Sequence, residues 1–349
     1  MSKMRLGIVG FGFMGHCDAD MMATFDEIDL VAVADTNPKQ LEDAPAGVET
    51  YNSIEEMLEK ADINVVMISV PNPLHLEMVV KSAQAGKHVI CEKPAAMSVE
   101  QFDKMVEVTK ENNVIFTVHQ QRRWDKDYRI MKEVYDKQMC GDVYVIKSQL
   151  YGFNGNMHDW HVYPEMGGGM LYDWGVHLID QILYMVDSEI ESIYADVRNI
   201  INEKVDDYFN ILIKFKNGIT AEIELGTYYL TPKRAWFIGG NKGSALIDGW
   251  DGEGKVVHTS HLLENVPGKI TMTAAGPTRS FGPAAPGLLT EEPLPEVDVA
   301  QRDYFVHFLK ALNGEEEIIV KPEQVRRVLC VMDAVRESAR TGQAVTNVK

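Results

Sequence analysis

The sequence has little that a membrane protein or a nucleic-acid-binding protein would need. No apolar run approaches the ~20 residues that a membrane-spanning helix requires. Cationic residues are in the minority, with 34 Lys and Arg against 52 Asp and Glu, and the formal net charge is -18. A polyanion would be repelled by such a chain. We therefore expect neither a membrane nor a nucleic acid among its partners.

Cysteine is also scarce. The chain has four cysteines, and no two of them form a C-x-x-C pair, so neither a zinc site nor a redox motif is indicated. The N-terminus runs straight into a strand pattern and lacks the apolar stretch and cleavage site of a signal peptide. These absences predict a cytoplasmic protein whose thiols are reduced and mostly buried.

The composition is that of a globular protein, with 45% hydrophobic and 25% charged residues. The length of 349 residues fits two domains. Residues 1–121 are predicted to form a Rossmann dinucleotide-binding domain of the α/β class. Their apolar runs do not alternate and are separated by helical patterns, which is typical of a parallel sheet covered on both faces. The predicted strands are Leu6–Val9, Leu30–Ala34, Val65–Val70, His88–Cys91 and Val114–Val118.

Residues 122–349 are predicted to form an α+β domain with a large, mostly antiparallel sheet for substrate binding and oligomerisation. Longer alternating strands follow one another here, and Asn217-Gly218 marks a hairpin turn. One helix, at about 169–186, interrupts the strands, and two helices at about 299–313 and 322–341 close the chain. Residues 264–297 are rich in Pro and Gly and are predicted to be a long loop.

A glycine motif, G-x-G-x-x-G, lies between the first predicted strand and the first predicted helix. Its glycines allow the tight turn, the approach of a pyrophosphate and the packing of helix on strand. The phosphates are expected on free N–H groups of the helix N-terminus. The residues of the motif are Gly10, Phe11, Gly12, Phe13, Met14 and Gly15.

Asp35 ends the second predicted strand, 20 residues after the last glycine of the motif. A carboxylate at this place accepts hydrogen bonds from the ribose hydroxyls and repels the 2′-phosphate of NADP. Thr36 and Asn37 follow with no Arg to receive that phosphate, and Lys39 is the nearest cation. The sequence therefore favours NAD over NADP.

Two groups of residues are candidates for chemistry. Lys93 follows the strand His88–Cys91, and ligands bind beyond the carboxyl ends of strands in such sheets. Asp173, His177 and Asp180 are spaced i, i+4 and i+7, so they share one helix face, where a carboxylate and an imidazole are costly to bury without a task. The alternatives left open are a surface lysine at a strand end and a structural hydrogen-bonded pair on the helix.

In combination and in order, these motifs resemble the glucose-fructose oxidoreductase/inositol dehydrogenase (Gfo/Idh/MocA) family. The resemblance also rests on the segments 70–75, 92–94 and 167–180, and it covers nearly the whole chain. It implies a catalytic set of Lys93, Asp173 and His177. It further implies a cofactor site that includes Pro71, Asn72, His75, Glu92, Lys93 and Pro94.

On the substrate side, the resemblance implies that Arg123 lies near the domain junction. The family's Trp-Arg pair is here Trp160-His161, and His cannot make the bidentate hydrogen bonds of Arg. We expect Arg123, Trp160, His161, Asp173 and His177 to contact substrate.

The residue types predict oxidation of a secondary alcohol. His177 would accept the hydroxyl proton, Lys93 would stabilise the developing alkoxide, and nicotinamide would take the hydride. We expect a sugar, inositol or glycoside as substrate and a homodimer or homotetramer. A redox-neutral glycosidase or lyase that uses transient oxidation is the alternative, with Tyr151, Tyr163 and His161 as candidates for its additional acid or base. Two histidine pairs, His158 with His161 and His258 with His261, lack further ligands, so no metal is expected.

Overall fold

The computed structural model describes residues 3–152, 159–249, 253–259, 270–279 and 287–348. Its N-terminal half contains a six-stranded sheet in the order β3-β2-β1-β4-β5-β6, in which every neighbouring pair is parallel. The strands are β1 (Met4–Val9), β2 (Ile28–Ala34), β3 (Glu49–Tyr51), β4 (Val65–Ile68), β5 (His88–Cys91) and β6 (Phe116–Val118). The predicted Rossmann-like α/β half is thus confirmed.

The helices of this half are α1 (Phe13–Met22), α2 (Ile54–Lys60), α3 (His75–Gln84) and α4 (Val99–Glu111). Helices α2 and α4 begin where serine caps stand in the sequence. Ser53 accepts a hydrogen bond from the Glu56 N–H at 3.2 Å, and Ser98 accepts one from Gln101 at 3.3 Å, as N-cap residues do. Helix α1 differs, because its N-cap is Gly12 and no side chain caps it. Its first N–H groups are therefore open to a ligand.

The C-terminal half contains a nine-stranded sheet in the order β16-β13-β12-β11-β7-β10-β9-β8-β17, in which only β7 and β10 pair in parallel. The predicted α+β domain with a mostly antiparallel sheet is confirmed. The strands are β7 (Val143–Tyr151), β8 (Ile190–Arg198), β9 (Tyr208–Phe215), β10 (Thr220–Gly226), β11 (Trp236–Gly240), β12 (Gly243–Ile247), β13 (Gly254–His258), β16 (Thr290–Pro293) and β17 (Val345–Thr346).

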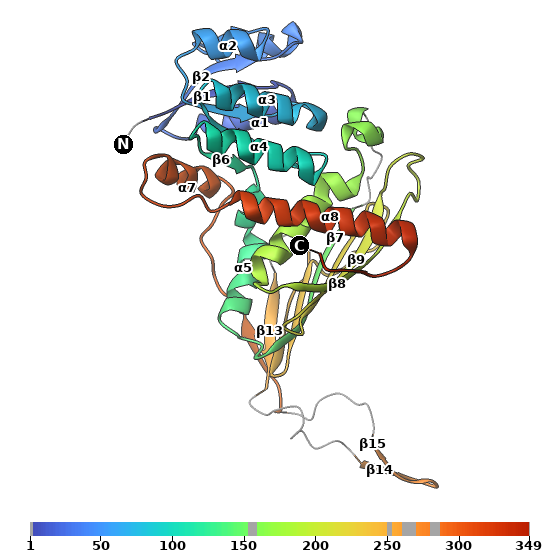
Figure 1. Ribbon diagram of the computed structural model, residues 1–349. Coiled ribbons are helices and arrows are strands. Elements are labelled where there is room, and N and C mark those ends of the chain that lie inside the picture. Colours follow the sequence, from blue (N-terminus) through green and yellow to red (C-terminus); the bar gives the residue numbers. More distant parts are fainter. Residues whose placement is uncertain (1–2, 153–158, 250–252, 260–269, 280–286, 349) are drawn as a thin grey trace.

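Helices cover one face of this sheet (Figure 1). They are α5 (Lys126–Asp136), α6 (Val176–Met185) and α8 (Pro322–Thr341). On the opposite face Tyr194 and Leu212 are exposed, and they lie directly across from each other in the β8–β9 register. The C-terminal sheet therefore carries an apolar pair on its open face.

Three expectations need correction. The segment 264–297 is not one loop, because it contains the hairpin of β14 (Ile270–Thr273) and β15 (Gly276–Arg279) and the edge strand β16. Strands β12 and β13 were not predicted at all. The expected helix at 169–186 starts with a π-helical turn, Leu171–Gly175, before α6.

Helix α7 (Asp303–Leu312) belongs in space with the nucleotide-binding half (Figure 1). The Phe305 ring lies 6.2 Å from that of Phe25 and 5.1 Å from that of His119. Thr117 donates a hydrogen bond to the Val320 carbonyl at 2.9 Å. The predicted division at residue 121 therefore follows the chain but not the packing, because the C-terminal segment returns to cover the N-terminal sheet.

Within the part of the chain that the structure describes, no helix has the length and apolarity to cross a membrane. The cytoplasmic location stays a prediction.

Candidate active site

The glycine loop leaves room for a dinucleotide. At Gly10, where φ is +86°, a Cβ atom would lie 2.5 Å from the Ser69 carbonyl oxygen, and at Gly15 it would lie 2.3 Å from the Gly10 oxygen. At Gly12 a Cβ atom would meet nothing within 4 Å. Packing thus requires the two outer glycines, while Gly12 faces open space at the uncapped start of α1. This is the cradle that a pyrophosphate needs.

Asp35 is fixed at the carboxyl end of β2 by two backbone groups. Its Oδ2 atom accepts a hydrogen bond from the Phe11 N–H at 2.8 Å, and its Oδ1 atom accepts one from the Asn37 N–H at 2.7 Å. The carboxylate therefore stands beside the glycine loop, where a ribose would lie. Phe13, at the start of α1, is 81% exposed, so its ring lies open at the mouth of the cradle. Together these residues fit a nicotinamide dinucleotide.

Lys93 and Asp173 meet although 80 positions separate them. The Lys93 Nζ atom donates to the Asp173 Oδ1 atom and to the Asp173 carbonyl oxygen, both at 2.9 Å. The lysine comes from the turn after β5, and the aspartate comes from the π-helical turn that precedes α6. The pair is partly open to solvent, with side-chain exposures of 16% and 26%. It joins the two halves of the molecule at a place that a substrate can reach.

His177 lies one turn further along the same helix and is buried. Its Nδ1 atom is 2.9 Å from the Gln120 Oε1 atom, and with the Gln120 amide oriented in this way Nδ1 carries the hydrogen. The Nε2 lone pair is then available as a base. Burial lowers the pKa of His177 well below its usual value, and the charges of Lys93, Arg122 and His119 lower it further. The imidazole is therefore neutral at pH 7.

Gln120 is a residue that the sequence analysis missed. In the structure the Asp173 carboxylate accepts a hydrogen bond from the Lys93 ammonium, and Gln120 is the residue that contacts the His177 imidazole. Gln120 follows β6 at the carboxyl edge of the parallel sheet and is 1% exposed. Its place after a strand was the only sequence signal, and no spacing connects it to His177.

Asp206 was missed as well. Its Oδ2 atom accepts a hydrogen bond from the Leu171 N–H at 2.7 Å, and its backbone oxygen accepts one from Met170 at 2.9 Å. Both donors belong to the start of the helix that carries Asp173. Gly169, where φ is +100°, would bring a Cβ atom within 2.3 Å of the Asp206 Oδ1 atom. Asp206 and Gly169 thus fix the turn from which Asp173 projects.

Arg123 lies inside the protein, and its contact with substrate stays a prediction. It is 1% exposed, and its Nε and Nη2 atoms donate to the two Asp180 carboxylate oxygens, each at 2.7 Å. Its Nη1 atom donates to Gln324 and to the Ile319 carbonyl oxygen. The buried guanidinium therefore connects α6 with α8 and with the segment that precedes α8. The same ion pair explains why Asp180 shares the helix face with His177.

His75 is also buried, at 1% exposure, and its pKa is lowered by burial. Its ring nitrogens lie 3.0 Å from the Pro94 carbonyl oxygen and 2.9 Å from that of Val70. Both oxygens belong to strand-end turns that flank the cofactor site. Asn72 donates to the Met166 carbonyl oxygen at 3.2 Å. Pro71 and Pro94 shape these two turns, and the Lys93–Pro94 peptide bond is cis.

The Trp160 and His161 rings stack on each other, with centroids 3.8 Å apart. They lie in the short helix Asp159–Val162, and the His161 carbonyl oxygen accepts a hydrogen bond from the Gly169 N–H at 3.2 Å. The pair is therefore attached to the glycines that lead into the Asp173 turn. His158 and His261, named above as metal candidates, lie outside the described residues.

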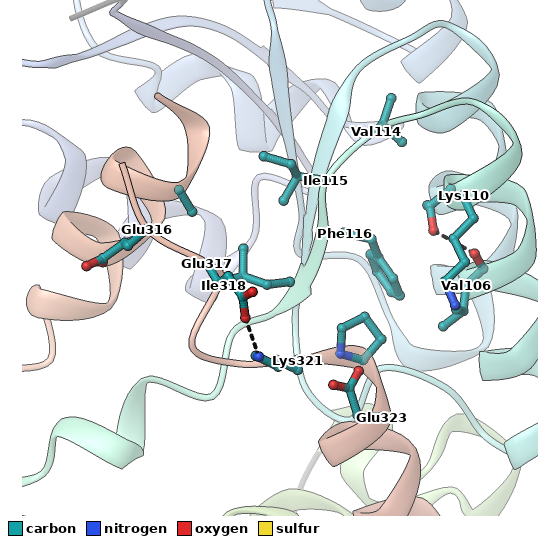
Figure 2. A pocket seen from close by; sticks show the side chains of 13 residues that line it. Val106, Lys110, Val114, Ile115, Phe116, Glu316, Glu317, Ile318, Lys321 and Glu323 are labelled. Carbon is teal, nitrogen blue, oxygen red and sulfur yellow. Dashed lines mark hydrogen bonds and ion pairs between the residues drawn. The ribbon is translucent and has the colours of Figure 1, made fainter. Parts of the chain in front are cut away.

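A cavity of about 420 Å³ lies away from all of these residues. Val114, Ile115 and Phe116 line it at the amino end of β6, together with side chains from α4 and the α7–α8 connection (Figure 2). The site residues lie at the opposite, carboxyl ends of the strands. Ligands of such sheets bind at the carboxyl ends, so we place the active site at Lys93 and not in this cavity.

Comparisons with known proteins decide the family. Residues 4–120 match the model of the oxidoreductase family with an NAD-binding Rossmann fold, and residues 128–246 match the Gfo/Idh/MocA C-terminal domain. The chain belongs to the Gfo/Idh/MocA family. An NAD-binding protein from Listeria innocua has a solved structure with a TM-score of 0.92 and 34% identity, over 99% of this chain and 100% of that one.

Two curated relatives differ in chemistry. A scyllo-inositol 2-dehydrogenase (NADP(+)) of Bacillus subtilis is 22% identical, over 99% of this chain and 96% of its own length. A 2,7-anhydro-N-acetylneuraminate hydratase of Mediterraneibacter gnavus is 27% identical, over 71% of this chain and 68% of its own. The family is an oxidoreductase family, and this member is an oxidoreductase with a nicotinamide-dinucleotide-binding domain.

Proposed function

We propose that this protein is an NAD-dependent dehydrogenase that oxidises a secondary hydroxyl of a sugar, inositol or glycoside. The observation that carries the proposal is the junction of Lys93 with Asp173 at 2.9 Å, one helical turn from a buried imidazole of lowered pKa. The junction lies where the cofactor half meets the C-terminal half. The scyllo-inositol dehydrogenase among the relatives supports a polyol or sugar as substrate.

The dinucleotide would be held by residues at the carboxyl ends of the parallel strands. These are Gly10, Gly12, Phe13, Met14, Gly15, Asp35, Pro71, Asn72, Glu92, Lys93 and Pro94, with His75 bracing the turns from behind. Asp35 would accept hydrogen bonds from the ribose hydroxyls, and its charge would disfavour a 2′-phosphate. When bound, the nicotinamide supplies the hydride acceptor. NAD is proposed although one relative uses NADP.

The chain's own residues then supply the proton chemistry. His177, neutral at pH 7, accepts the substrate hydroxyl proton at Nε2, and Gln120 keeps its ring oriented from the Nδ1 side. The Lys93 ammonium stabilises the alkoxide that develops as the proton leaves. Asp173 holds the Lys93 side chain until substrate arrives. Trp160 and His161 would line the far side of the substrate, with the indole on the apolar face of a sugar ring.

The second candidate is a redox-neutral hydratase or lyase that keeps its cofactor. The hydratase among the relatives favours it. Such a reaction needs another acid or base near the pocket, and Tyr163, which is 43% exposed beside Trp160 and His161, would serve. The simpler residue set needed for net oxidation favours the dehydrogenase.

A panel of sugars, inositols and glycosides with excess NAD tests the proposal, with nicotinamide absorbance and product measured together. One NADH for each product supports a dehydrogenase. Product that accumulates without NADH, from enzyme purified with bound cofactor, supports the redox-neutral reaction and overturns the proposal. Asp35→Ala is the matched control, since it should lose turnover in either case through weaker cofactor binding.

We further propose a homodimer or homotetramer that forms through the open face of the C-terminal sheet. The exposed Tyr194 and Leu212 pair supports it, because association of two copies through this face would remove both apolar side chains from water. Mass photometry of Leu212→Lys should give smaller particles than the unchanged protein. Unaltered particle mass would place the interface elsewhere.

A further inference from the structure

Three ionisable side chains are buried together beneath the active site, and the mechanism above uses none of their protons. They are Asp18 on α1, Glu92 after β5 and His119 after β6, with exposures of 3%, 5% and 4%. Two carboxylates and one imidazole in an apolar interior are costly unless they neutralise one another. Their places connect the cofactor helix with the ends of two central strands.

A chain of close contacts connects Asp18, at one end of this cluster, with Lys93 at the other. The His119 Nδ1 atom is 2.5 Å from the Glu92 Oε1 atom and 3.9 Å from the Asp18 Oδ1 atom. The second Asp18 oxygen accepts a hydrogen bond from the Ser69 hydroxyl at 3.1 Å. The second Glu92 oxygen accepts one from the Lys93 N–H at 3.0 Å. His119 thereby fixes Glu92, and Glu92 fixes the turn that carries the catalytic lysine.

A metal ion does not fit this geometry, although the three ligand atoms lie within 4.8 Å of one another. Metal ligands stand about 2 Å from the ion and so about 3 Å or more from each other. The 2.5 Å contact between His119 and Glu92 is a charge-assisted hydrogen bond that an ion would have to break. The cluster holds protons instead.

The charges are set by opposing effects. Burial opposes the charged form of His119, but the Glu92 carboxylate and then Asp18 outweigh it and raise the pKa of the imidazole. Burial likewise opposes the ionised form of Glu92, and the His119 charge outweighs it, so the pKa of Glu92 is lowered. Burial, with Glu92 adding to it, raises the pKa of Asp18 to about 7. At neutral pH the His119 cation faces the Glu92 anion.

The other titratable groups that interact with the cluster come from every element around it. They are Cys17 on α1, Cys91 and Lys93 at β5, His75 on α3, Tyr304 on α7 and His177 on α6. Of these groups, Lys93 is the one whose backbone N–H donates a hydrogen bond to a carboxylate of the cluster.

We propose that Asp18, Glu92 and His119 form a buried charge unit that positions the Lys93 turn. The three are positioning residues, and the proposal rests on the catalytic role of Lys93 proposed above. The unit also couples α1, which holds the cofactor, to the lysine that acts on the substrate.

The first test reads the charge of His119 without any need for turnover. Histidine labelled at Cε1 is titrated by NMR in the cofactor-free protein, and the His119 signal is assigned by its loss in His119→Gln. We expect a cation at pH 7, and we expect Glu92→Gln to lower its pKa by roughly one unit or more. Asp18→Asn should lower it by less. A neutral His119 at pH 6.5, or a titration that Glu92→Gln does not move, overturns the charge unit.

The second test reads the effect on Lys93 by acetic anhydride labelling and mass spectrometry. In His119→Gln the partner that fixes Glu92 is lost, so the Lys93 turn should loosen and Lys93 should be labelled about threefold faster at pH 8. Glu92→Gln keeps an oxygen acceptor for the Lys93 N–H, so the labelling rate of Lys93 should rise by less. His307→Gln is the matched control, because His307 pairs with Glu316 at 2.6 Å elsewhere on the molecule.

A rise in the labelling rate of Lys93 in His119→Gln that exceeds the rise in Glu92→Gln supports the proposal, provided that the other lysines and the control variant keep their rates. An unchanged rate at Lys93 in His119→Gln, or an equal rise at all lysines, overturns it. Neither test needs a substrate. Failure to find dehydrogenase activity would therefore count against the proposed function and leave the charge unit to be decided separately.

Discussion

The cofactor side and the substrate side of this site are built in different ways. The phosphate- and ribose-binding part of the cofactor side comes from one short segment, in which Gly10, Gly12 and Gly15 turn the chain and Asp35 is fixed by the backbone of Phe11 and Asn37. The substrate side is assembled from side chains far apart in the sequence. Lys93 reaches Asp173 across 80 positions, and His177 reaches Gln120 across 57.

This difference has a functional consequence. A continuous loop whose shape is set by glycine packing binds one kind of ligand, the phosphates, and can tolerate change elsewhere. A site made from distant side chains depends on the packing of two halves, and substitutions in either half can retune it. We therefore expect cofactor binding to survive changes at Lys93, Asp173 and His177, and turnover to be lost.

The largest effect is expected at the catalytic set. Lys93→Met should lower kcat by about 10²-fold or more, since it removes the positive charge beside the developing alkoxide. His177→Ala should behave similarly, because no base remains. Steady-state kinetics with a substrate found in the panel, together with NAD titration by fluorescence, measure both sides. Near-normal turnover in either variant would mean that the wrong residues have been chosen. Loss of NAD binding would mean that the cofactor side and the substrate side do not act independently.

The features of the cofactor side could be predicted from the sequence better than those of the substrate side. The parallel sheet, the glycine loop and the two capped helices could be predicted because each depends on local chemistry: a φ that only glycine adopts readily, a serine that caps, an apolar run that must be buried. The pairing of Lys93 with Asp173 could be guessed only from resemblance.

The misses have a common physical cause. Gln120 and Asp206 contribute through hydrogen bonds to residues 57 and 35 positions away, and no periodicity encodes such contacts. Arg123 was assigned to substrate from the resemblance, and its burial and its pairing with Asp180 could not be predicted from the sequence. Strands β12 and β13 are short, and strands β14 to β16 lie in the Gly- and Pro-rich stretch, so pairing with neighbouring strands, and not propensity, forms these strands.

The second prediction compares two glycines of one loop. Gly10→Ala forces a residue with a Cβ into φ +86° and against the Ser69 carbonyl, so it should destabilise the fold by about 2 kcal/mol or more. Gly12→Ala meets nothing within 4 Å and should leave stability within about 0.5 kcal/mol of the unchanged protein, while NAD binding weakens. Thermal unfolding with and without NAD separates the two. Equal destabilisation by both would show that Gly12 is also a packing residue.

The third prediction concerns the choice of cofactor. Asp35→Ser together with Thr36→Arg removes the carboxylate and supplies a cation for a 2′-phosphate, so the preference for NAD should narrow by about 10- to 100-fold. Titration with NAD and NADP gives the ratio for each protein, and Thr36→Arg alone is the control that keeps the carboxylate. Better binding of NADP by the unchanged protein would overturn the reading of Asp35.

The smallest effect is expected on the substrate side, in the pH dependence of stability. Burial raises the pKa of Asp206 from 3.8 to about 6, and its ionised form is partly compensated by the Leu171 N–H. Because the folded pKa lies above the unfolded one, Asp206 stabilises the fold most below pH 3.8, and this contribution is lost as the pH rises through about 6.

Asp206→Asn keeps an oxygen acceptor for Leu171 and removes the titration. Between pH 5 and pH 7.5 the unfolding free energy of the unchanged protein should therefore fall relative to that of the variant by about 1 kcal/mol, which is a few degrees in Tm. Asp207→Asn is an informative comparison, because the pKa of Asp207 is lowered from 3.8. The stabilisation that ionised Asp207 provides is therefore fully present between pH 5 and pH 7.5 and is lost only at lower pH, so the difference between this variant and the unchanged protein should stay constant over this range. Melting curves of all three proteins across this range give the answer. The difference in unfolding free energy between the unchanged protein and Asp206→Asn could instead be independent of pH. In that case the acid beside the Asp173 turn is not destabilised by burial, and this part of the substrate side does not differ from the cofactor side in the way that the structure indicates.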